Sequence, residues 1–307
     1  MPYAKAKDGT HLYYKDWGRG DPVVLLHGWP LTGDTFDDAA LALVEEGFRA
    51  IIPDRRGFGR SDQPWDGYDY DTFADDVAAV LEDAKISEPV ALVGFSMGGG
   101  EVARFITKQG ARRVSKAVLI SSVVPYMLKT DDNPDGVPQA TFDEMTAGMK
   151  KDRAHFFKGF LKDFYGVGAL TSPVSDEVLA DSWRQTMMAG LRPTLAAAKA
   201  FATTDFRPDL ANFGDVPTLV IHGTSDKTVP IDATGRVVAK SVPGATLIEY
   251  DGSAHGLFAT DKERLIDDLV AFLGGEAPAA ERSASSREAE YLAQEDSRSA
   301  IPLGQPI

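Results

Sequence analysis

The sequence predicts an α/β fold, with a mostly parallel, doubly wound sheet and an inserted helical cap. Short apolar runs typical of buried strands recur along the chain and alternate with helical patterns. Between residues 121 and 213 the strand patterns stop and only helical patterns remain. After residue 274 the composition shifts to Ala, Ser, Glu, Arg and Pro. We therefore expect a core at 1–120 and 214–274, a cap at 121–213, and a tail at 275–307 that is disordered or forms a short docking helix.

In the first half of the core, strands alternate with helices. Strands are predicted at 12–17, 23–26, 50–52, 90–93 and 116–120, and those at 23–26, 50–52 and 90–93 are apolar runs typical of buried strands. Asp71 is expected to cap a helix whose first turn is acidic. A second helix is expected to run through Glu101–Phe105 and to follow the strand at 90–93 directly.

The cap and the second half of the core complete the predicted fold. Within the cap, helices are expected at 142–164, 176–188 and 195–203. Helices inserted between the two halves of a sheet could cover one of its edges and shape a pocket there. Strands at 216–222 and 245–250 and an amphipathic helix at 261–273 then close the core.

The most informative segment is Gly94-Phe95-Ser96-Met97-Gly98, which joins a predicted strand to a predicted helix. In a turn this tight, side chains two residues on either side of Ser96 would collide, so glycine is needed at both places. The turn would hold the Ser96 hydroxyl above the sheet as a nucleophile. Gly-x-Ser-x-Gly also occurs in ordinary glycine-rich loops, but the flanking strand and helix favour the nucleophile elbow.

Two later residues complete a candidate catalytic triad. Asp226 follows the strand at 216–222 and His255 follows the strand at 245–250, where parallel sheets collect catalytic residues. A serine hydroxyl is a weak nucleophile until a neighbouring base removes its proton, and an acid must orient that base. The alternatives are a turn or helix cap for Asp226 and an ordinary loop position for His255.

The segment His27-Gly28-Trp29-Pro30 follows the strand at 23–26. In a protein with a nucleophile elbow, two backbone amides form the oxyanion hole. One belongs to the residue after the serine and the other to the loop after this earlier strand. The expected donors are therefore the backbone N–H groups of Met97 and Trp29. His27 is interpreted as structural, bonded to loop backbone. Asp54 and Arg55, in the next strand's exit loop, are expected below the site, where they tie loops together.

On these residues the sequence resembles the cofactor-free (non-haem) haloperoxidase, aryl-esterase and perhydrolase branch of the α/β-hydrolases. The resemblance covers about residues 2–274 and rests on the following blocks: 27–30, 54–61, 94–100, 204–208 and 216–223. It implies a triad of Ser96, Asp226 and His255, with no metal and no other cofactor. It also implies that Pro30, which follows the oxyanion tryptophan, favours perhydrolysis, in which hydrogen peroxide intercepts the acyl-enzyme.

The resemblance also places residues in the substrate pocket. Met127, Phe201, Thr228 and Ile231 match pocket positions, and we expect Trp29 and Phe95 to contact the substrate as well. Thr228 departs from the usual aliphatic residue, which leaves the preferred chain length open.

Composition excludes several other classes of protein. A net charge of −14 argues against a nucleic-acid partner, and no run of about 20 apolar residues is present that could span a membrane. The absence of cysteine excludes disulfides and thiolate metal sites and fits a cytoplasmic protein. A small-molecule ester is the expected partner, and a homo-oligomer is left open.

The function expected from the sequence is hydrolysis of short-chain or aryl esters through an acyl-serine, with perhydrolase activity on the side. A lactonase or an amidase or lactamase would use the same triad. A ligand-binding protein on this fold would usually lack a triad member or an elbow glycine, and this chain has them all. A dehalogenase or epoxide hydrolase would need a carboxylate at position 96.

Overall fold

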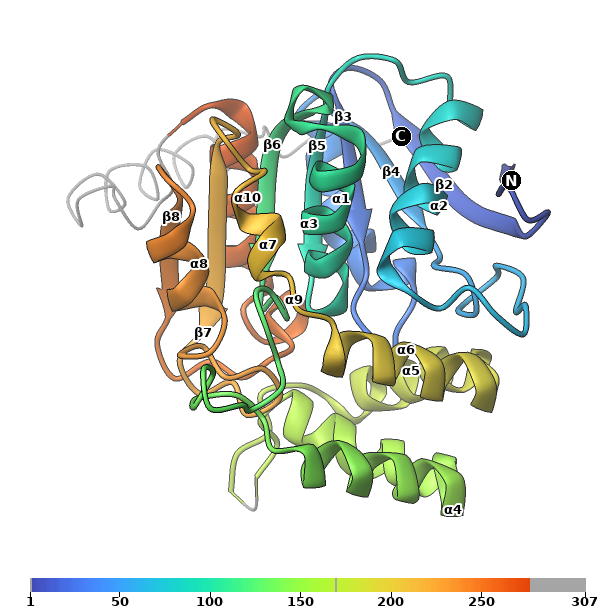
Figure 1. Cartoon of the computed structure of the whole chain (residues 1–307), viewed down its shortest axis with the longest axis vertical. Helices are drawn as coiled ribbons and strands as arrows, with labels where there is room; N and C mark the ends of the chain where they lie inside the picture. Colours follow the sequence, from blue (N-terminus) through green and yellow to red (C-terminus); the bar gives the residue numbers. More distant parts are fainter. Residues whose placement is uncertain (1, 169, 277–307) are drawn as a thin grey trace, which may run out of the picture. The chain divides into compact units, whose positions relative to one another are not determined.

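The computed structural model describes residues 2–168 and 170–276. In this part of the chain one sheet contains eight strands, in the spatial order β1-β2-β4-β3-β5-β6-β7-β8 (Figure 1). The first two pairings are antiparallel and the remaining ones are parallel. The strands are β1 (Tyr3–Lys5), β2 (His11–Gly18), β3 (Pro22–Leu26), β4 (Arg49–Pro53), β5 (Val90–Phe95), β6 (Val114–Ile120), β7 (Thr218–Gly223) and β8 (Thr246–Tyr250).

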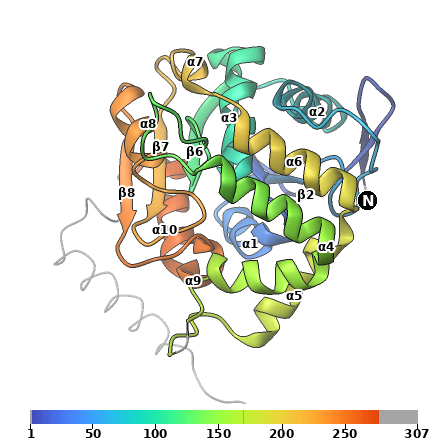
Figure 2. The same ribbon diagram turned by 60° about the horizontal axis from the view of Figure 1, so that its bottom comes forward.

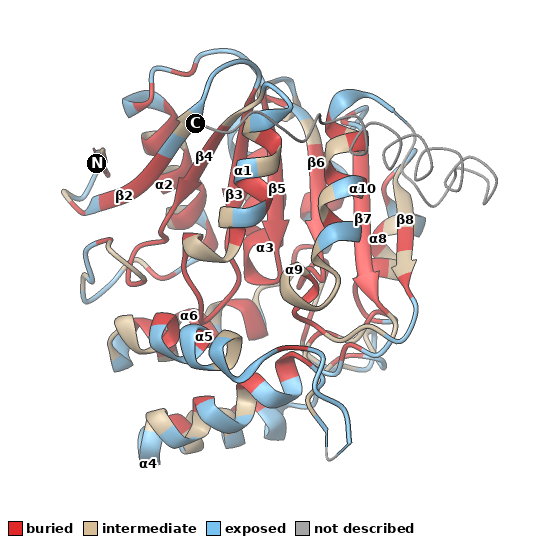
Figure 3. Ribbon diagram, turned by 180° about the vertical axis from the view of Figure 1, so that it is seen from behind, coloured by how far each residue is buried: buried red, intermediate tan, exposed pale blue. Residues whose placement is uncertain are grey.

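Helices cover both faces of this sheet. In Figure 1, α2 (Tyr70–Asp83) and α3 (Met97–Gln109) lie in front of the strands, whereas α1 (Asp37–Glu45) lies on the opposite face, seen in Figure 3. The shorter elements are η1 (Gly33–Phe36), η2 (Ala111–Arg113), α7 (Arg207–Leu210), α8 (Gly235–Ser241) and α9 (Leu257–Thr260). The predicted α/β fold class is thus confirmed, with the mostly parallel sheet doubly wound.

The central strands are buried on both faces, which explains their continuous apolar sequences. Every residue of β3, β5 and β7 is buried, and Figure 3 shows these strands almost entirely in the colour of buried residues. Parallel strands covered by helices on both faces need apolar side chains at every position rather than at alternate ones. The carboxyl ends of these strands therefore form a rigid edge on which loops can be held.

Three helices form the cap, and they follow one another between residues 139 and 203. They are α4 (Gln139–Phe164), α5 (Asp176–Met188) and α6 (Leu191–Thr203), and Figure 2 shows them side by side. Helix α5 has the predicted bounds, and Ser175 caps it by accepting a hydrogen bond from the Val178 N–H. The other two begin three or four residues earlier than predicted.

Helix α4 is interrupted at Asp152, whose backbone is extended (φ −158°, ψ 91°). Its carboxylate accepts the backbone N–H of His155 at 3.0 Å, so Asp152 acts as an N-cap for the second half of the helix. This second half carries Phe156, Phe160 and Phe164 at four-residue spacing, which places their rings along one face.

One predicted cap is wrong. Helix α2 is capped by Asp69, whose side chain accepts the Thr72 N–H at 2.9 Å, and Asp71 lies inside the first turn instead. The Asp69 backbone is extended, as an N-cap requires, and Asp71 already has a helical backbone.

The described residues fall into two units. A compact unit at 1–262 carries the sheet and the cap, and α10 (Lys262–Gly274) belongs almost entirely to the second unit, which begins at Glu263. Nearly all of the predicted tail, 277–307, lies outside the described residues. Among the helices that the structure describes, none has the length and apolar character needed to cross a membrane.

Candidate active site

The turn between β5 and α3 has the geometry of a nucleophile elbow. Ser96 has φ 53° and ψ −117°, in the left-handed half of conformational space that non-glycine residues avoid. A Cβ on Gly94 would lie 2.5 Å from the Gly98 carbonyl oxygen, and one on Gly98 would lie 2.1 Å from the Leu26 carbonyl oxygen. Both glycines are therefore required by close backbone approach, as the sequence pattern predicts.

The structure brings Ser96, His255 and Asp226 together, although they are far apart in the sequence. His255 Nε2 lies 2.9 Å from Ser96 Oγ, and His255 Nδ1 lies 2.6 Å from Asp226 Oδ2. The three side chains follow β5, β8 and β7, so the carboxyl edge of the sheet positions all of them. All three residues are buried in the protein. This hydrogen-bonded chain can move the serine proton to the imidazole and stabilise the charge that results.

Four groups surround the Asp226 carboxylate. Oδ1 accepts the backbone N–H groups of Thr228 and Val229 at 2.9 and 2.8 Å. Oδ2 faces His255 and also His222, whose Nε2 lies 3.4 Å away and donates to the Val229 carbonyl. Burial alone would raise the pKa of Asp226, but the His255 charge and the hydrogen bonds from both histidines hold it well below its usual range. Asp226 thus stays ionised while His255 gains a proton.

Two backbone amides are available for an oxyanion. Met97 opens α3, where the first N–H groups have no partner within the helix. In the part of the chain that the structure describes, neither the Met97 N–H nor the Trp29 N–H donates a hydrogen bond, and both residues are buried. A Cβ on Gly28 would lie 3.0 Å from Ser96 Cβ, which shows how closely the loop after β3 approaches the serine.

Aromatic side chains enclose the triad. The Phe164 ring stands edge-on to the His255 imidazole with centroids 4.8 Å apart, and Phe95 lies 5.0 Å from the same ring. Trp29 packs against Phe157, Phe160 and Phe201 of the cap, and its indole Nε1 donates to the Thr194 carbonyl at 3.0 Å. Trp29 therefore connects the oxyanion loop to the cap helices.

A cavity of about 460 Å³ opens beside Ser96 under the cap. Of the residues predicted to bind substrate, four line it: Trp29, Met127, Phe201 and Thr228. Phe95 and Ile231 are not part of its lining, because the Phe95 ring packs between His255, Phe164 and Phe258, and Ile231 is buried in the turn after β7. The rest of the wall is mostly apolar and comes largely from the cap: Val123, Val137, Thr141, Phe142, Met145, Phe156, Phe160, Asp163, Lys227 and Val229.

His222 and most of the cap lining are absent from the sequence-based predictions. His222 is the fifth residue of β7, and its apolar strand context gives no indication of a polar role. The lining residues on α4 alternate with exposed ones in an amphipathic pattern that ordinary helix packing also produces. Only the position of the cap over Ser96 distinguishes the residues that line the pocket from those that pack in the core.

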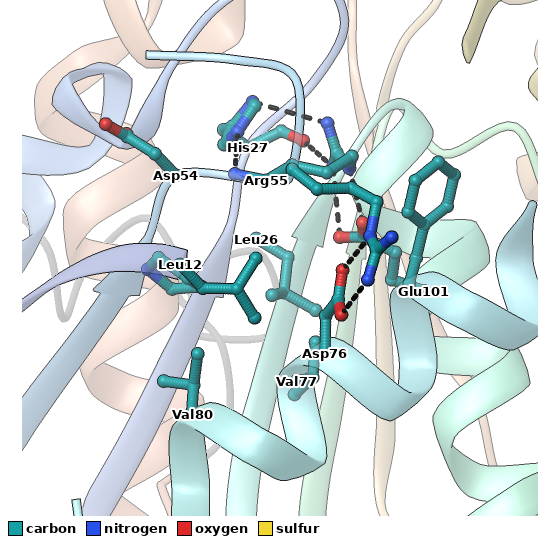
Figure 4. A pocket seen from close by; sticks show the side chains of 12 residues that line it. Leu12, Leu26, His27, Asp54, Arg55, Asp76, Val77, Val80 and Glu101 are labelled. Atoms are coloured by element: carbon teal, nitrogen blue, oxygen red, sulfur yellow. Dashed lines mark hydrogen bonds and ion pairs between the residues drawn. The ribbon is translucent and has the colours of Figure 1, made fainter. Parts of the chain in front are cut away.

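Asp54 and Arg55 lie buried below the site, as the sequence predicts. The Arg55 guanidinium binds both carboxylate oxygens of Glu101, on α3, and also donates to the His27 carbonyl (Figure 4). His27 Nε2 accepts the Arg55 backbone N–H at 3.0 Å. Burial, together with the Arg55 charge, lowers the pKa of His27 well below its usual value, so the imidazole is neutral. Asp54 Oδ1 accepts the Gly33 N–H at 2.8 Å. These side chains connect the oxyanion loop to the elbow helix.

Arg55→Ala is expected to lower the free energy of unfolding by about 3–5 kcal/mol, because it leaves the Glu101 carboxylate buried without its partner. Thermal or urea unfolding measures the effect. Arg184→Ala is the control, since Arg184 forms an exposed ion pair with Asp181 and its loss should cost about 1 kcal/mol or less. An Arg55→Ala protein that unfolds like the wild type yet has no activity would contradict the structural role.

Comparisons with known proteins identify the family of this chain. The family model described as the alpha/beta hydrolase fold matches residues 21–262. A non-heme chloroperoxidase of Kitasatospora aureofaciens is 44% identical over 275 residues, covering 89% of this chain and 99% of the relative. A bifunctional esterase/perhydrolase of Acinetobacter calcoaceticus is 43% identical over 276 residues, with the same coverage.

Solved structures give the same result. A bromoperoxidase from Bacillus anthracis superposes with a TM-score of 0.85 at 42% identity, covering 89% of this chain and 99% of the other. An esterase from Exiguobacterium antarcticum superposes with a TM-score of 0.83 at 33% identity, covering 89% and 98%. With the matched family model and these relatives, the chain belongs to the α/β-hydrolase family, in the group that contains the non-heme haloperoxidases and the esterase/perhydrolase.

Proposed function

We propose that this protein hydrolyses carboxylic esters through an acyl-Ser96 intermediate and also catalyses perhydrolysis. The observation that carries the proposal is the hydrogen-bonded chain from Ser96 through His255 to Asp226 at the wall of a mostly apolar cavity. The similarity to an esterase/perhydrolase and to non-heme chloroperoxidases supports the choice of ester and peracid chemistry.

In the proposed acylation step, Ser96 Oγ attacks the ester carbonyl while His255 Nε2 removes its proton. The oxyanion that forms accepts the N–H groups of Trp29 and Met97, a type of contact worth about 100- to 1,000-fold in turnover for each donor. His255 then returns the proton to the departing alkoxide. Asp226 stays ionised throughout and stabilises the imidazolium.

The second half of the reaction decides the product. When water attacks the acyl-Ser96 carbonyl, the product is a carboxylic acid. When hydrogen peroxide attacks instead, the product is a peracid, and His255 serves as the base in both cases. Starting from a carboxylic acid, the sum is acid plus hydrogen peroxide giving peracid plus water. Every group in the proposed scheme is a side chain or backbone amide of this chain.

The cavity favours substrates with an apolar or aryl group. Four phenylalanines, two methionines and Trp29 contribute to its wall, so burying an apolar group there removes hydrocarbon surface from water. Lys227 and Asp163 are the charged residues of the lining, and both are exposed. Lactones and amides remain the alternative substrates, because the same triad would open them.

Substrate screening tests this proposal. Purified protein is assayed with p-nitrophenyl esters of increasing chain length, aryl esters, lactones and anilides, and separately for peracid from acetate and hydrogen peroxide. We expect the esters to be turned over with the highest kcat/KM and peracid to accumulate. Faster lactone or anilide turnover would transfer the assignment to that class, and a protein inert to all of them would refute it.

Pro30→Leu is expected to lower the ratio of perhydrolysis to ester hydrolysis while sparing the latter. Pro30 follows Trp29, which lines the cavity, and its ring restricts the backbone there. We expect the Trp29 carbonyl to accept a hydrogen bond from bound peroxide. Both rates are measured on one preparation of each variant. Pro22→Ala, in β3 away from the pocket lining, is the control proline. If the ratio of perhydrolysis to ester hydrolysis is unchanged in Pro30→Leu, Pro30 only shapes the loop and has no role in perhydrolysis.

A cytoplasmic location is a further part of the proposal, and the oligomeric state is left open. The location is supported by the absence of cysteine. Cell fractionation tests the location, and light scattering of the full chain measures the oligomeric state.

A further inference from the structure

Two methionines share the catalytic cavity with Ser96. Met127 lies in the loop after β6 and is 2% exposed, and Met145 lies on α4 and is partly buried. Both contribute to the wall of the 460 Å³ cavity that also contains Ser96. The rest of this wall is mainly hydrocarbon and aromatic. A thioether is readily oxidised to a sulfoxide, so these are the side chains there most susceptible to an oxidant.

We propose that the peracid made at Ser96 oxidises Met127 and Met145, and that this oxidation weakens the binding of apolar esters in the cavity. The inference rests on the proposed perhydrolase activity. The terminal peroxy oxygen is transferred to the sulfur, the O–O bond breaks, and the proton passes to the carboxylate oxygen that leaves. One peracid and one thioether thus give one carboxylic acid and one sulfoxide, so the peracid is reduced and the methionine is oxidised.

Confinement makes these sulfurs the first targets. A peracid released from acyl-Ser96 occupies the cavity before it reaches bulk water, and a confined reactant has a high effective concentration. The remaining described methionines are placed differently. Met187 and Met188, at the end of α5, are partly exposed and meet oxidants in bulk solvent, whereas Met97 and Met149 are buried outside the lining.

Oxidation would change binding more than chemistry. A sulfoxide is polar, and the mostly apolar wall offers its oxygen few hydrogen-bond donors in place of water. We therefore expect KM for apolar esters to rise as the two methionines are oxidised. Neither methionine takes part in the hydrogen bonds of the triad, so kcat and labelling of Ser96 by a fluorophosphonate should change little.

The test follows each methionine by peptide mass spectrometry while the protein turns over acetate and hydrogen peroxide. Peracid is measured in parallel through its oxidation of bromide. We expect Met127 and Met145 to gain an oxygen about tenfold faster than Met187 and Met188. Ser96→Ala in the same mixture makes no peracid and should leave the cavity pair unmodified. Peracetic acid added to Ser96→Ala from outside should reverse the order, with the partly exposed pair oxidised first.

Variants then connect modification to function, each compared with its own starting activity. Met127→Leu/Met145→Leu nearly conserves volume and should keep its KM constant during peroxide turnover. Met149→Leu, on the same helix as Met145 but outside the cavity, should lose affinity as fast as the wild type. If peracid is produced but Met187 and Met188 are oxidised as fast as the cavity pair or faster, this inference is wrong and the perhydrolase proposal stands. Absence of peracid would overturn the perhydrolase proposal and this inference with it.

Discussion

Ser96→Ala is expected to lower kcat/KM for p-nitrophenyl acetate by about 10,000-fold or more, because the members of a triad act as one unit. The alanine removes only the Oγ that lies 2.9 Å from His255 Nε2 and leaves the oxyanion amides in place. Folding should be preserved, since alanine meets the same left-handed backbone strain at φ 53° that serine does. Steady-state kinetics measures the loss of kcat/KM, and thermal unfolding checks that the fold is preserved. Fluorophosphonate labelling should be lost together with the Ser96 hydroxyl.

Ser121→Ala is the matched control. Ser121 directly follows the neighbouring strand β6, also has positive φ (43°), and is fully buried. Its Oγ has no hydrogen-bond partner in the described part of the chain, so its removal should leave stability unchanged or slightly higher. Activity and labelling should stay at the wild-type level. Substantial ester turnover by Ser96→Ala would show that a different residue is the nucleophile.

The elbow could be predicted because steric requirements leave a signature in sequence. Neighbouring backbone would clash with a Cβ at position 94 or 98. Glycine is therefore required two residues before and two residues after Ser96, and this spacing can be recognised in the sequence. Asp226 and His255 could be predicted for a related reason, since each follows a buried strand and parallel strands end at one edge. Glycine spacing and strand ends therefore suffice to predict these three residues as a candidate triad.

Other features depend on tertiary packing and leave no such signature. Helices α1 and α8 are not predicted, because Leu41-Ala42-Leu43-Val44 and Val237-Val238 are short apolar runs that fit a strand equally well. Phe95 is adjacent to the nucleophile in sequence, yet its ring packs against His255 and away from the cavity. The contact of His222 with Asp226 likewise depends on how the turn after β7 folds back.

Asp226→Asn is expected to lower kcat by about 10,000-fold with little change in KM, through the wrong imidazole tautomer. The backbone N–H groups of Thr228 and Val229 both donate to the Oδ1 position, so the asparagine carbonyl oxygen must stay there. Its NH₂ group then occupies the Oδ2 position and donates to His255 Nδ1. His255 is left with its proton on Nε2, facing Ser96, where it cannot accept the serine proton.

Asp232→Asn is the control for the loss of one negative charge near the site. Asp232 is exposed and pairs with Arg236 at the start of α8, so activity should be unchanged. The protonation state of His255 distinguishes the proposed cause from simple misfolding. In the Asp226→Asn variant, NMR should show the proton of the His255 imidazole on Nε2 at neutral pH. Asp226 in the wild type stays charged because the charge of His255 and the hydrogen bonds from both histidines hold its pKa well below the usual range, so protonation of this carboxylate does not explain the loss of activity in the variant. Retention of more than about a tenth of wild-type kcat by Asp226→Asn would contradict the role of Asp226 as the orienting acid.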